Sequence, residues 1–297
     1  MTFLCKNAEY STTRRLLATE PFNRVPGDAA AVRGGLRFLG FEKAGAAGKP
    51  LFSVIMAVFN SSAVLEHAIR SVIYQDYDNV ELIVIDGGST DGSVDLIRKY
   101  DECIDYWVSE PDDGIYYALN KGIEAAKGDW LYFLGSDDVM LNCLHQLACR
   151  FADPNGVYYG DVYYPARHKL FGGEFSAYRV MNCQIPHQAT FYPKQLFLRY
   201  KFDTRYISAS DYAFNIVCYN DKDFKYRYLP VLVAVYEDTS GFSTQDLDKR
   251  FHEEKNDLLR KYFSRSNYRK YVIRTFIKGF DRYFVRKIFN LFKKKAV

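Results

Sequence analysis

Two patterns of apolar and polar positions alternate along the first half of the chain. Mostly apolar stretches, typical of strands buried on both faces of a sheet, lie at 52–59, 80–85, 104–108 and 130–134. Between them, apolar residues recur at helical spacing over 64–73, 93–100 and 114–127. Strands and helices that alternate at such short intervals predict an α/β fold, with a mostly parallel central sheet flanked by helices.

The regular alternation of strands and helices ends after residue 151. Predicted strands of a mixed sheet follow at 156–164, 169–171 and 226–235, with predicted helices at 210–219 and from about 247 onward. The segment before the first strand is rich in Gly and Ala and predicts loosely ordered chain. We therefore expect an N-terminal extension, a main α/β domain and a helical C-terminal tail, with the boundaries 1–49, 50–245 and 246–297.

Polar side chains follow three of the predicted strands at the points where they end. Asn60 comes after the first strand, Asp86 after the second, and Asp137 and Asp138 after the fourth. The carboxyl ends of parallel strands meet at one edge of a sheet, where α/β proteins bind ligands. Two adjacent acids repel each other unless a cation lies beside them, and a divalent metal holding phosphates meets that need. The sequence therefore predicts a metal–diphosphate site at this edge.

A Gly-rich loop follows the second strand. Residues 86–92 read Asp-Gly-Gly-Ser-Thr-Asp-Gly, and glycine allows the backbone to approach a ligand closely. The alternative is an ordinary strand–helix turn with Asp91 as a helix cap. The Gly-x-Gly-x-x-Gly dinucleotide fingerprint is absent after the first strand.

Four segments, taken in this order, resemble those of the family 2 glycosyltransferases. They are FSVIMAVFN at 52–60, VIDGGSTDG at 84–92, NKGIEAAKG at 120–128 and LGSDD at 134–138. The resemblance covers residues 50–245. It implies an inverting enzyme on the nucleotide-diphospho-sugar-binding GT-A fold.

The resemblance implies roles for residues on the donor side. The residues expected to line the nucleotide-sugar pocket are Ala57, Phe59, Asn60, Asp86, Asp91, Asp113 and Ser136. Among them, Asp86 would contact the base, with Asp91 or the acids Asp112 and Asp113 nearby. Asp137 occupies the last position of the family's Asp-x-Asp metal motif. The first position is Gly135 here, so Asp138 is the candidate for the second contact to Mn²⁺ or Mg²⁺, which would neutralise the leaving nucleotide.

On the acceptor side the resemblance points to Asp211. It occupies the place of an acid pair before a helix, whose first member is Ser210 here. An inverting transfer needs a base near the acceptor hydroxyl, and we expect partial burial to raise the basicity of Asp211. The alternative is a helix cap. His187 and Gln188 would hold the donor sugar or the acceptor, or are packing residues, and the loop 239–243 would close over the diphosphate or is a plain turn.

Charge is distributed unevenly along the chain. The net charge is +4, yet residues 265–297 contain eleven Lys and Arg and one acid, Asp281. Apolar residues recur there at helical spacing, at Ile273, Ile277, Phe280, Phe284, Ile288 and Leu291. A basic amphipathic helix of this kind predicts contact with an anionic membrane surface, or packing on the domain or a second subunit. Nucleic acid is not an expected partner, because no recognised module accompanies the charge.

Cysteine spacing and hydropathy indicate the compartment. No two of the six cysteines have Cys-x-x-Cys spacing, no signal peptide follows Met1, and no uncharged run reaches the ~20 residues of a membrane span. We expect a cytoplasmic protein, peripheral on the inner face of the cytoplasmic membrane.

The leading hypothesis is an inverting, metal-dependent glycosyltransferase. It would move a sugar, with a UDP-sugar as the default donor, to a glycan that is lipid-linked, as in bacterial surface polysaccharide synthesis. The alternatives are a non-catalytic nucleotide-sugar-binding protein, a membrane-docking scaffold and a nucleotidyltransferase. The last normally carries a Gly-rich basic loop after the first strand, and residues 57–62 contain neither Gly nor Lys. The oligomeric state is left open.

Overall fold

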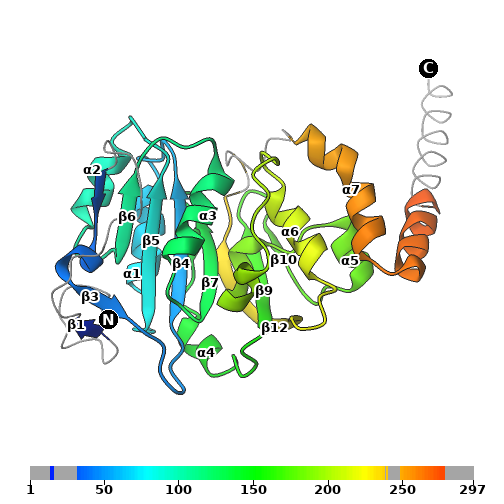
Figure 1. The fold of residues 1–297 in the computed structure, drawn as a ribbon, viewed down its shortest axis with the longest axis horizontal. Coiled ribbons are helices and arrows are strands. Elements are labelled where there is room, and N and C mark those ends of the chain that lie inside the picture. Colours follow the sequence, from blue (N-terminus) through cyan, green and yellow to red (C-terminus); the bar gives the residue numbers. More distant parts are fainter. Residues whose placement is uncertain (1–13, 17–31, 238, 240–247, 278–297) are drawn as a thin grey trace.

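A mixed sheet flanked by helices forms the centre of the molecule. The computed structural model describes residues 14–16, 32–237, 239 and 248–277 (Figure 1). The first half of the sheet consists of β4 (Phe52–Val58), β5 (Val80–Asp86), β6 (Tyr106–Ser109) and β7 (Trp130–Gly135). These strands pair in parallel in the order β6-β5-β4-β7. The α/β fold with a largely parallel sheet, predicted from the alternating pattern, is confirmed.

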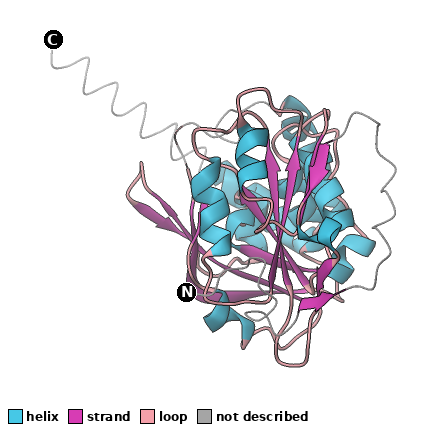
Figure 2. Ribbon diagram, turned by 90° about the vertical axis from the view of Figure 1, so that its left-hand side faces the viewer, coloured by secondary structure: helices cyan, strands magenta, loops and turns pink. Residues whose placement is uncertain are grey.

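Helices cover both faces of the parallel strands (Figure 1, Figure 2). They are α1 (Leu65–Ile73), α2 (Ser93–Lys99) and α3 (Ile115–Ala125). Successive β4 side chains alternate between the faces, so Val54 and Met56 pack with α1 while Ile55 packs with α3. Gly122 allows α3 to pack closely on β4, because a Cβ at this position would clash with Ile55. The fully buried strands thus read as continuous apolar runs.

Two expected helix ends differ in the structure. Asn60 and the following serines do not cap α1, which begins at Leu65 after Val64 without a side-chain cap. The predicted helix over 114–127 ends at Ala125, and the N–H of Gly128 donates instead to Ser53 Oγ at 2.8 Å. Asn60 and Gly128 instead form contacts with residues distant along the chain, which sequence periodicity cannot predict.

The second half of the sheet is mixed. Its strands are β8 (Val139–Met140), β9 (Gly156–Tyr164), β10 (Lys169–Phe171), β11 (Thr190–Pro193) and β12 (Lys225–Val235). β11 joins the halves, since it pairs antiparallel with both β7 and β9. This four-residue strand has no pattern of its own and was not predicted.

Short helices surround these strands. They are α4 (Leu144–Ala148), α5 (Ala177–Asn182), η3 (His187–Ala189), η4 (Lys194–Leu198), α6 (Ser210–Cys218) and α7 (Lys249–Tyr262). A third core cluster, rich in Tyr and Phe, joins α5, α6 and α7 to β9. This packing holds the start of α6, and with it Asp211, against the sheet.

Residues 32–43 are ordered, contrary to the expectation from their Gly- and Ala-rich surroundings. β2 (Val32–Gly34) pairs antiparallel with β6, and η2 (Leu36–Leu39) and β3 (Phe41–Lys43) follow, with β1 (Arg14–Leu16) beside β3.

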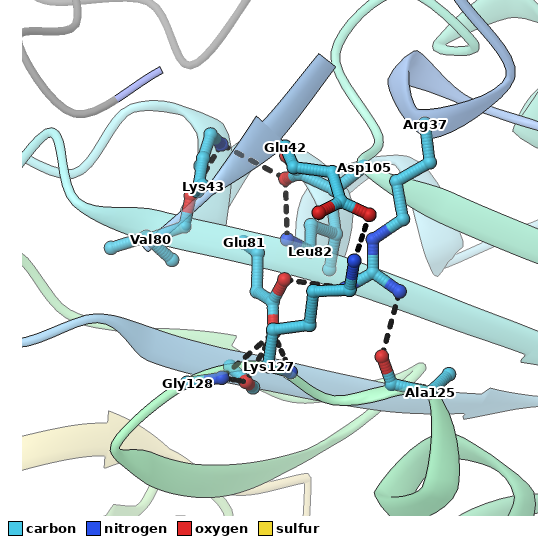
Figure 3. Close-up of polar contacts among 11 residues, drawn as sticks. Arg37, Glu42, Lys43, Val80, Glu81, Leu82, Asp105, Ala125, Lys127 and Gly128 are labelled. Carbon is cyan, nitrogen blue, oxygen red and sulfur yellow. Dashed lines mark hydrogen bonds and ion pairs between the residues drawn. The ribbon is translucent and has the colours of Figure 1, made fainter. Parts of the chain in front are cut away.

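Two buried cations tie this N-terminal segment to the sheet. Arg37 binds Glu81 at 2.6 Å and Lys43 binds Asp105 at 2.9 Å, with side-chain exposures of 4% or less (Figure 3). Lys127 and Glu42 form a further ion pair there. Composition statistics miss such charge pairing, which is why loose order was the wrong expectation.

The chain continues beyond α7 as a helix over residues 265–277. Its exposed apolar side chains are Val272, Ile273, Phe276 and Ile277. Among the described residues no helix combines the length and hydropathy required to cross a bilayer. Phe280 and the rest of the predicted basic helix, and all of the 239–243 loop except Thr239, lie outside the described residues.

Candidate functional site

The carboxyl ends of β4, β5 and β7 lie at one edge of the sheet. Val58 pairs with Asp86 and Ala57 with Gly135, so the three strands end at the same level. The prediction that the polar residues after these strands share one rim is confirmed by this register.

Asp86 organises the Gly-rich loop that follows β5. Its carboxylate is completely buried and accepts hydrogen bonds from the N–H groups of Gly88 and Ser89 and the hydroxyls of Ser89 and Ser109, at 2.5–3.0 Å. Gly88 has φ 83°, a left-handed conformation that suits glycine. Asp86 therefore shapes the loop in this structure, and its predicted contact with a base stays a prediction.

Asn60 joins the end of β4 to the same loop. Its Oδ1 accepts from Thr90 N–H at 2.9 Å, and its N–H donates to Ser89 Oγ at 2.7 Å. Asn60 adopts φ 48°, which an Asn tolerates better than most residues. The neighbouring Phe59 is 65% exposed, while Ala57 is half-buried. This geometry leaves an exposed aromatic ring beside an ordered loop.

Two acids, Asp91 in the loop and Asp112 beside it, accept hydrogen bonds from the backbone of neighbouring segments. Asp91 accepts from the N–H groups of Ser62 and Ser93 at 2.8 and 3.0 Å. Burial raises its pKa, but the bonds from Ser93 and Ser62 outweigh that effect and hold the pKa well below its usual range. Asp112 accepts from Gly114 N–H at 3.0 Å and lies against Gly87, while Asp113 is exposed. Asp91 and Asp112 thus border the predicted donor pocket.

Asp137 and Asp138 turn toward the space left by Gly135. A Cβ built on Gly135 would lie 2.6 Å from Asp138 Oδ2 and 2.8 Å from Asp137 Oδ1. Burial and the charge of Asp137 raise the pKa of Asp138 to about 7, and burial also raises the pKa of Asp137. No group of three or more His, Cys, Asp or Glu suited to a metal occurs among the described residues.

These two carboxylates fit a divalent cation. Mg²⁺ in proteins is typically held by one or two carboxylates, with phosphates and waters completing the shell. Ser136 ties the turn in place through a 2.8 Å hydrogen bond between its hydroxyl and that of Ser61. The Glu237 N–H donates to Asp138 Oδ1 at 2.9 Å, a contact that sequence reasoning missed.

Asp211 lies in the first turn of α6 and is 4% exposed. Its Oδ1 accepts from the Tyr116 hydroxyl and the Tyr212 N–H, each at 2.9 Å. Its Oδ2 accepts from the Gln184 amide and lies 2.5 Å from His187 Nδ1. Tyr116 and Gln184 were not predicted, because nothing in their local sequence indicates a contact with a residue so distant along the chain.

The pKa of Asp211 moves in the direction opposite to our expectation. Burial raises it, but the hydrogen bond and charge of His187 and the bond from Tyr116 outweigh burial, so the pKa is lowered. The expectation of raised basicity was wrong because it counted burial without these donors.

The short helix η3 connects Asp211 with the acids after β7. Burial lowers the pKa of His187. The negative charges of Asp211, Asp138 and Asp137 raise it by more than burial lowers it, so the net shift is upward. Gln188 is buried, and its carbonyl accepts from the Tyr132 hydroxyl at 2.6 Å. The structure therefore brings Asp137, Asp138, His187 and Asp211 to one place from three elements.

Comparison with known proteins assigns the chain to a family. The sequence profile described as "Glycosyl transferase family 2" matches residues 53–209. A "PGL/p-HBAD biosynthesis glycosyltransferase" of Mycobacterium bovis is 34% identical over 211 residues, 68% of this chain and 82% of its own. An uncharacterized glycosyltransferase of Haemophilus influenzae is 41% identical over 96 residues, 31% of this chain and 38% of its own.

Solved structures show the same fold. Staphylococcus aureus TarS 1–349 in complex with UDP-GlcNAc superposes with a TM-score of 0.55 at 17% identity, covering 73% of this chain and 74% of its own. In another crystal structure of S. aureus TarS, the match covers 73% of this chain and 44% of that chain, with a TM-score of 0.52. The mannosyltransferase PcManGT of Pyrobaculum calidifontis, in complex with GDP-Man and Mn²⁺, has a TM-score of 0.50 at 20% identity and covers 66% of this chain and 59% of its own. The GT-A fold implied by the sequence resemblance is confirmed.

Proposed function

Because the chain belongs to glycosyl transferase family 2, we propose that it transfers a sugar, with inversion, from a nucleotide-diphosphate donor to a hydroxyl of a glycan. The observation that carries the proposal is that His187, which is hydrogen-bonded to Asp211, also interacts electrostatically with Asp137 and Asp138 at the carboxyl end of β7. A donor site and an acid on its acceptor side are the two parts that such a transfer requires.

On the donor side, Asp137 and Asp138 would hold Mn²⁺ or Mg²⁺. When bound, the metal neutralises charge on the diphosphate leaving group. Phe59, Asn60 and the loop around Asp86 receive the nucleotide. We propose a UDP-sugar as donor, which the UDP-GlcNAc complex of TarS supports, although the PcManGT complex contains GDP-Man.

On the acceptor side, we propose that Asp211 is the base that removes the proton from the attacking hydroxyl. His187 links the two sides, because it is hydrogen-bonded to Asp211 and interacts electrostatically with Asp137 and Asp138. His187 and Gln188 face the donor sugar or the acceptor.

The acceptor is a lipid-linked glycan at an anionic membrane surface. The helix 265–277 supports this, because it exposes Ile273 and Phe276 and carries Arg269, Lys270 and Arg274. Each basic residue near such a surface contributes roughly 1 kcal/mol. We propose that the enzyme acts at the inner face of the cytoplasmic membrane in surface polysaccharide synthesis.

A nucleotide-sugar panel with Mn²⁺ tests the catalytic proposal. Thermal-shift screening selects the donor, and release of the nucleoside diphosphate with lipid-linked acceptors measures transfer. The anomeric configuration of the product, read by NMR, tests inversion. Donor binding without hydrolysis or transfer would instead identify a non-catalytic binder, the alternative that Gly135 and Ser210 favour.

Vesicle flotation tests the membrane proposal independently. The full chain should float with phosphatidylglycerol-containing vesicles and lose this at high salt, while a chain ending at residue 264 should not float. Equal flotation of both chains would remove the tail as the membrane contact.

A further inference from the structure

The hairpin formed by β9 and β10 exposes basic and apolar side chains together. Residues 162–173 contain Arg167 and Lys169 but no Asp or Glu. Arg167, Lys169 and Leu170 are exposed, and Leu170 is 62% exposed. β10 is an edge strand of the described sheet, and a lysine commonly protects such an edge. That role accounts for Lys169, but it does not account for a leucine left uncovered beside it.

Two tyrosines lie directly behind this hairpin tip. In the antiparallel register Tyr164 is opposite Lys169 and Tyr163 is opposite Leu170, and both tyrosines are half-buried. The Arg167 guanidinium lies 5.4 Å from the centre of the Tyr164 ring. Segments at a membrane–water interface combine the same groups, because tyrosine rings sit at the headgroup level and long basic side chains reach the lipid phosphates.

The helix 265–277 reaches the same part of the molecule through α5. The guanidinium of Arg274 lies 4.8 Å from the centre of the Tyr178 ring on α5 (Figure 1). The next residue of α5, Arg179, lies 5.4 Å from the centre of the Phe171 ring in β10. Consecutive residues of one short helix therefore contact the helix 265–277 on one side and the β9–β10 hairpin on the other.

The base of the hairpin is also bonded to the candidate site. The Tyr236 N–H donates to the Tyr163 carbonyl at 2.9 Å, and the N–H of the next residue, Glu237, donates to Asp138 Oδ1 at 2.9 Å. The rings of Tyr236 and Tyr164 lie 5.2 Å apart. A bilayer in contact with the hairpin would thus lie near Asp138, where a lipid-linked acceptor has to arrive.

We infer that the tip of the β9–β10 hairpin is a second membrane contact, which binds the headgroups of anionic lipids together with the helix 265–277. The inference rests on the proposed function, since it supposes a lipid-linked acceptor. Arg167 and Lys169 meet the lipid phosphates, and Leu170 enters the boundary between headgroups and acyl chains. One weak contact with a bilayer is marginal and reversible, whereas two linked contacts bind more tightly and fix the orientation of the site.

Binding of the full chain to vesicles of phosphatidylglycerol and phosphatidylcholine tests the charge contribution. Arg167→Gln combined with Lys169→Gln should lower the partition coefficient about 20–30-fold. The matched control is Lys222→Gln combined with Lys225→Gln. It removes the same charge from exposed positions at the opposite end of β9, where Lys225 pairs with Gly156. This control should bind within about twofold of the unaltered chain, because salt screens charges so far from the bilayer.

Brominated lipids test the contact directly. Trp107 and Trp130 are buried, so Leu170→Trp adds an exposed fluorophore at the hairpin tip. Its emission should move to shorter wavelength on the vesicles and should be quenched by brominated acyl chains. Leu198→Trp is the matched control, since Leu198 on η4 is 82% exposed, and its added fluorescence should show neither change. Thermal unfolding checks that all variants are folded.

Three results would overturn the inference. They are unchanged partitioning of the variant that lacks Arg167 and Lys169, no quenching of Leu170→Trp on vesicles that bind the protein, and no binding of the unaltered chain to anionic vesicles. Unchanged partitioning with a loss of transfer to a water-soluble acceptor would assign the hairpin to glycan binding instead. If the protein binds the vesicles as expected but transfers no sugar from any donor, the proposed catalytic function fails and the membrane contact stands, because flotation requires no turnover.

Discussion

Acids at the two ends of the same sheet have opposite surroundings. At one end Glu81 and Asp105 each bind a buried cation, Arg37 and Lys43 (Figure 3). At the carboxyl end Asp137 and Asp138 stand side by side, and no Lys or Arg of the described residues forms an ion pair with them. At the first end, each acid is neutralised by a cation of the protein itself. At the carboxyl end, Asp137 and Asp138 remain available to bind a cation that arrives with the ligand.

The difference separates stability from function. Removing one partner of a buried ion pair leaves an uncompensated charge and costs folding free energy. Two adjacent carboxylates without a cation already carry such a cost, and ligand binding relieves it. Substitutions at the two ends should therefore change different measurements.

The largest effect is expected from Arg37→Met. Glu81, 1% exposed, would lose its buried cation, and the free energy of unfolding should fall by about 3–5 kcal/mol in urea titrations. Adding Glu81→Gln should recover part of the loss. Mn²⁺-dependent donor binding of the remaining folded protein should be unchanged, and a loss below about 1 kcal/mol would contradict the account.

Asp137→Ala should act on function instead. Loss of one of the two carboxylates that face Gly135 should reduce Mn²⁺-dependent transfer by about 10²–10³-fold, the range seen when one charge-stabilising group is removed. The thermal midpoint in EDTA should stay the same or rise. Unchanged metal dependence would reject the site.

The pH dependence of stability should distinguish Asp138 from Glu81 and Asp105, which are paired with cations. Its folded pKa of about 7 lies above the unfolded value of about 3.9, so the folded state binds more protons between these values and stability falls as pH rises. In EDTA we expect the free energy of unfolding to drop by about 2 kcal/mol from pH 5 to pH 7. Asp138→Asn should flatten this dependence, and the same slope in the variant would assign it to other groups.

The smallest effect is expected at the exposed pair of Arg98 and Asp95 on α2. Their side chains are 51% and 81% exposed, and solvent screens the pair. Arg98→Met should change the free energy of unfolding by about 0–1 kcal/mol in the same titration. This variant is the matched control for Arg37→Met, and an equal loss in both would mean that burial of the charge is not what matters.

The parallel half of the fold was predictable because its signal is local. Residues 52–59 and 80–85 are mostly apolar on both faces, and strand ends in a parallel sheet must share an edge. The common rim of Asn60, Asp86 and Asp137 follows from that rule alone. The four-residue strand β11 was missed, since its position depends on β7 and β9 rather than on any pattern of its own.

The sequence by itself determined the α/β class, the family and the edge where the polar strand ends meet, because these depend on periodicity and on residues close together along the chain. Only the tertiary structure decided how the charges are paired. Arg37 meets Glu81 across 44 positions, and Tyr116 meets Asp211 across 95. Burial together with hydrogen bonding sets the state of a carboxylate, and both come from segments that fold together after the local elements are specified.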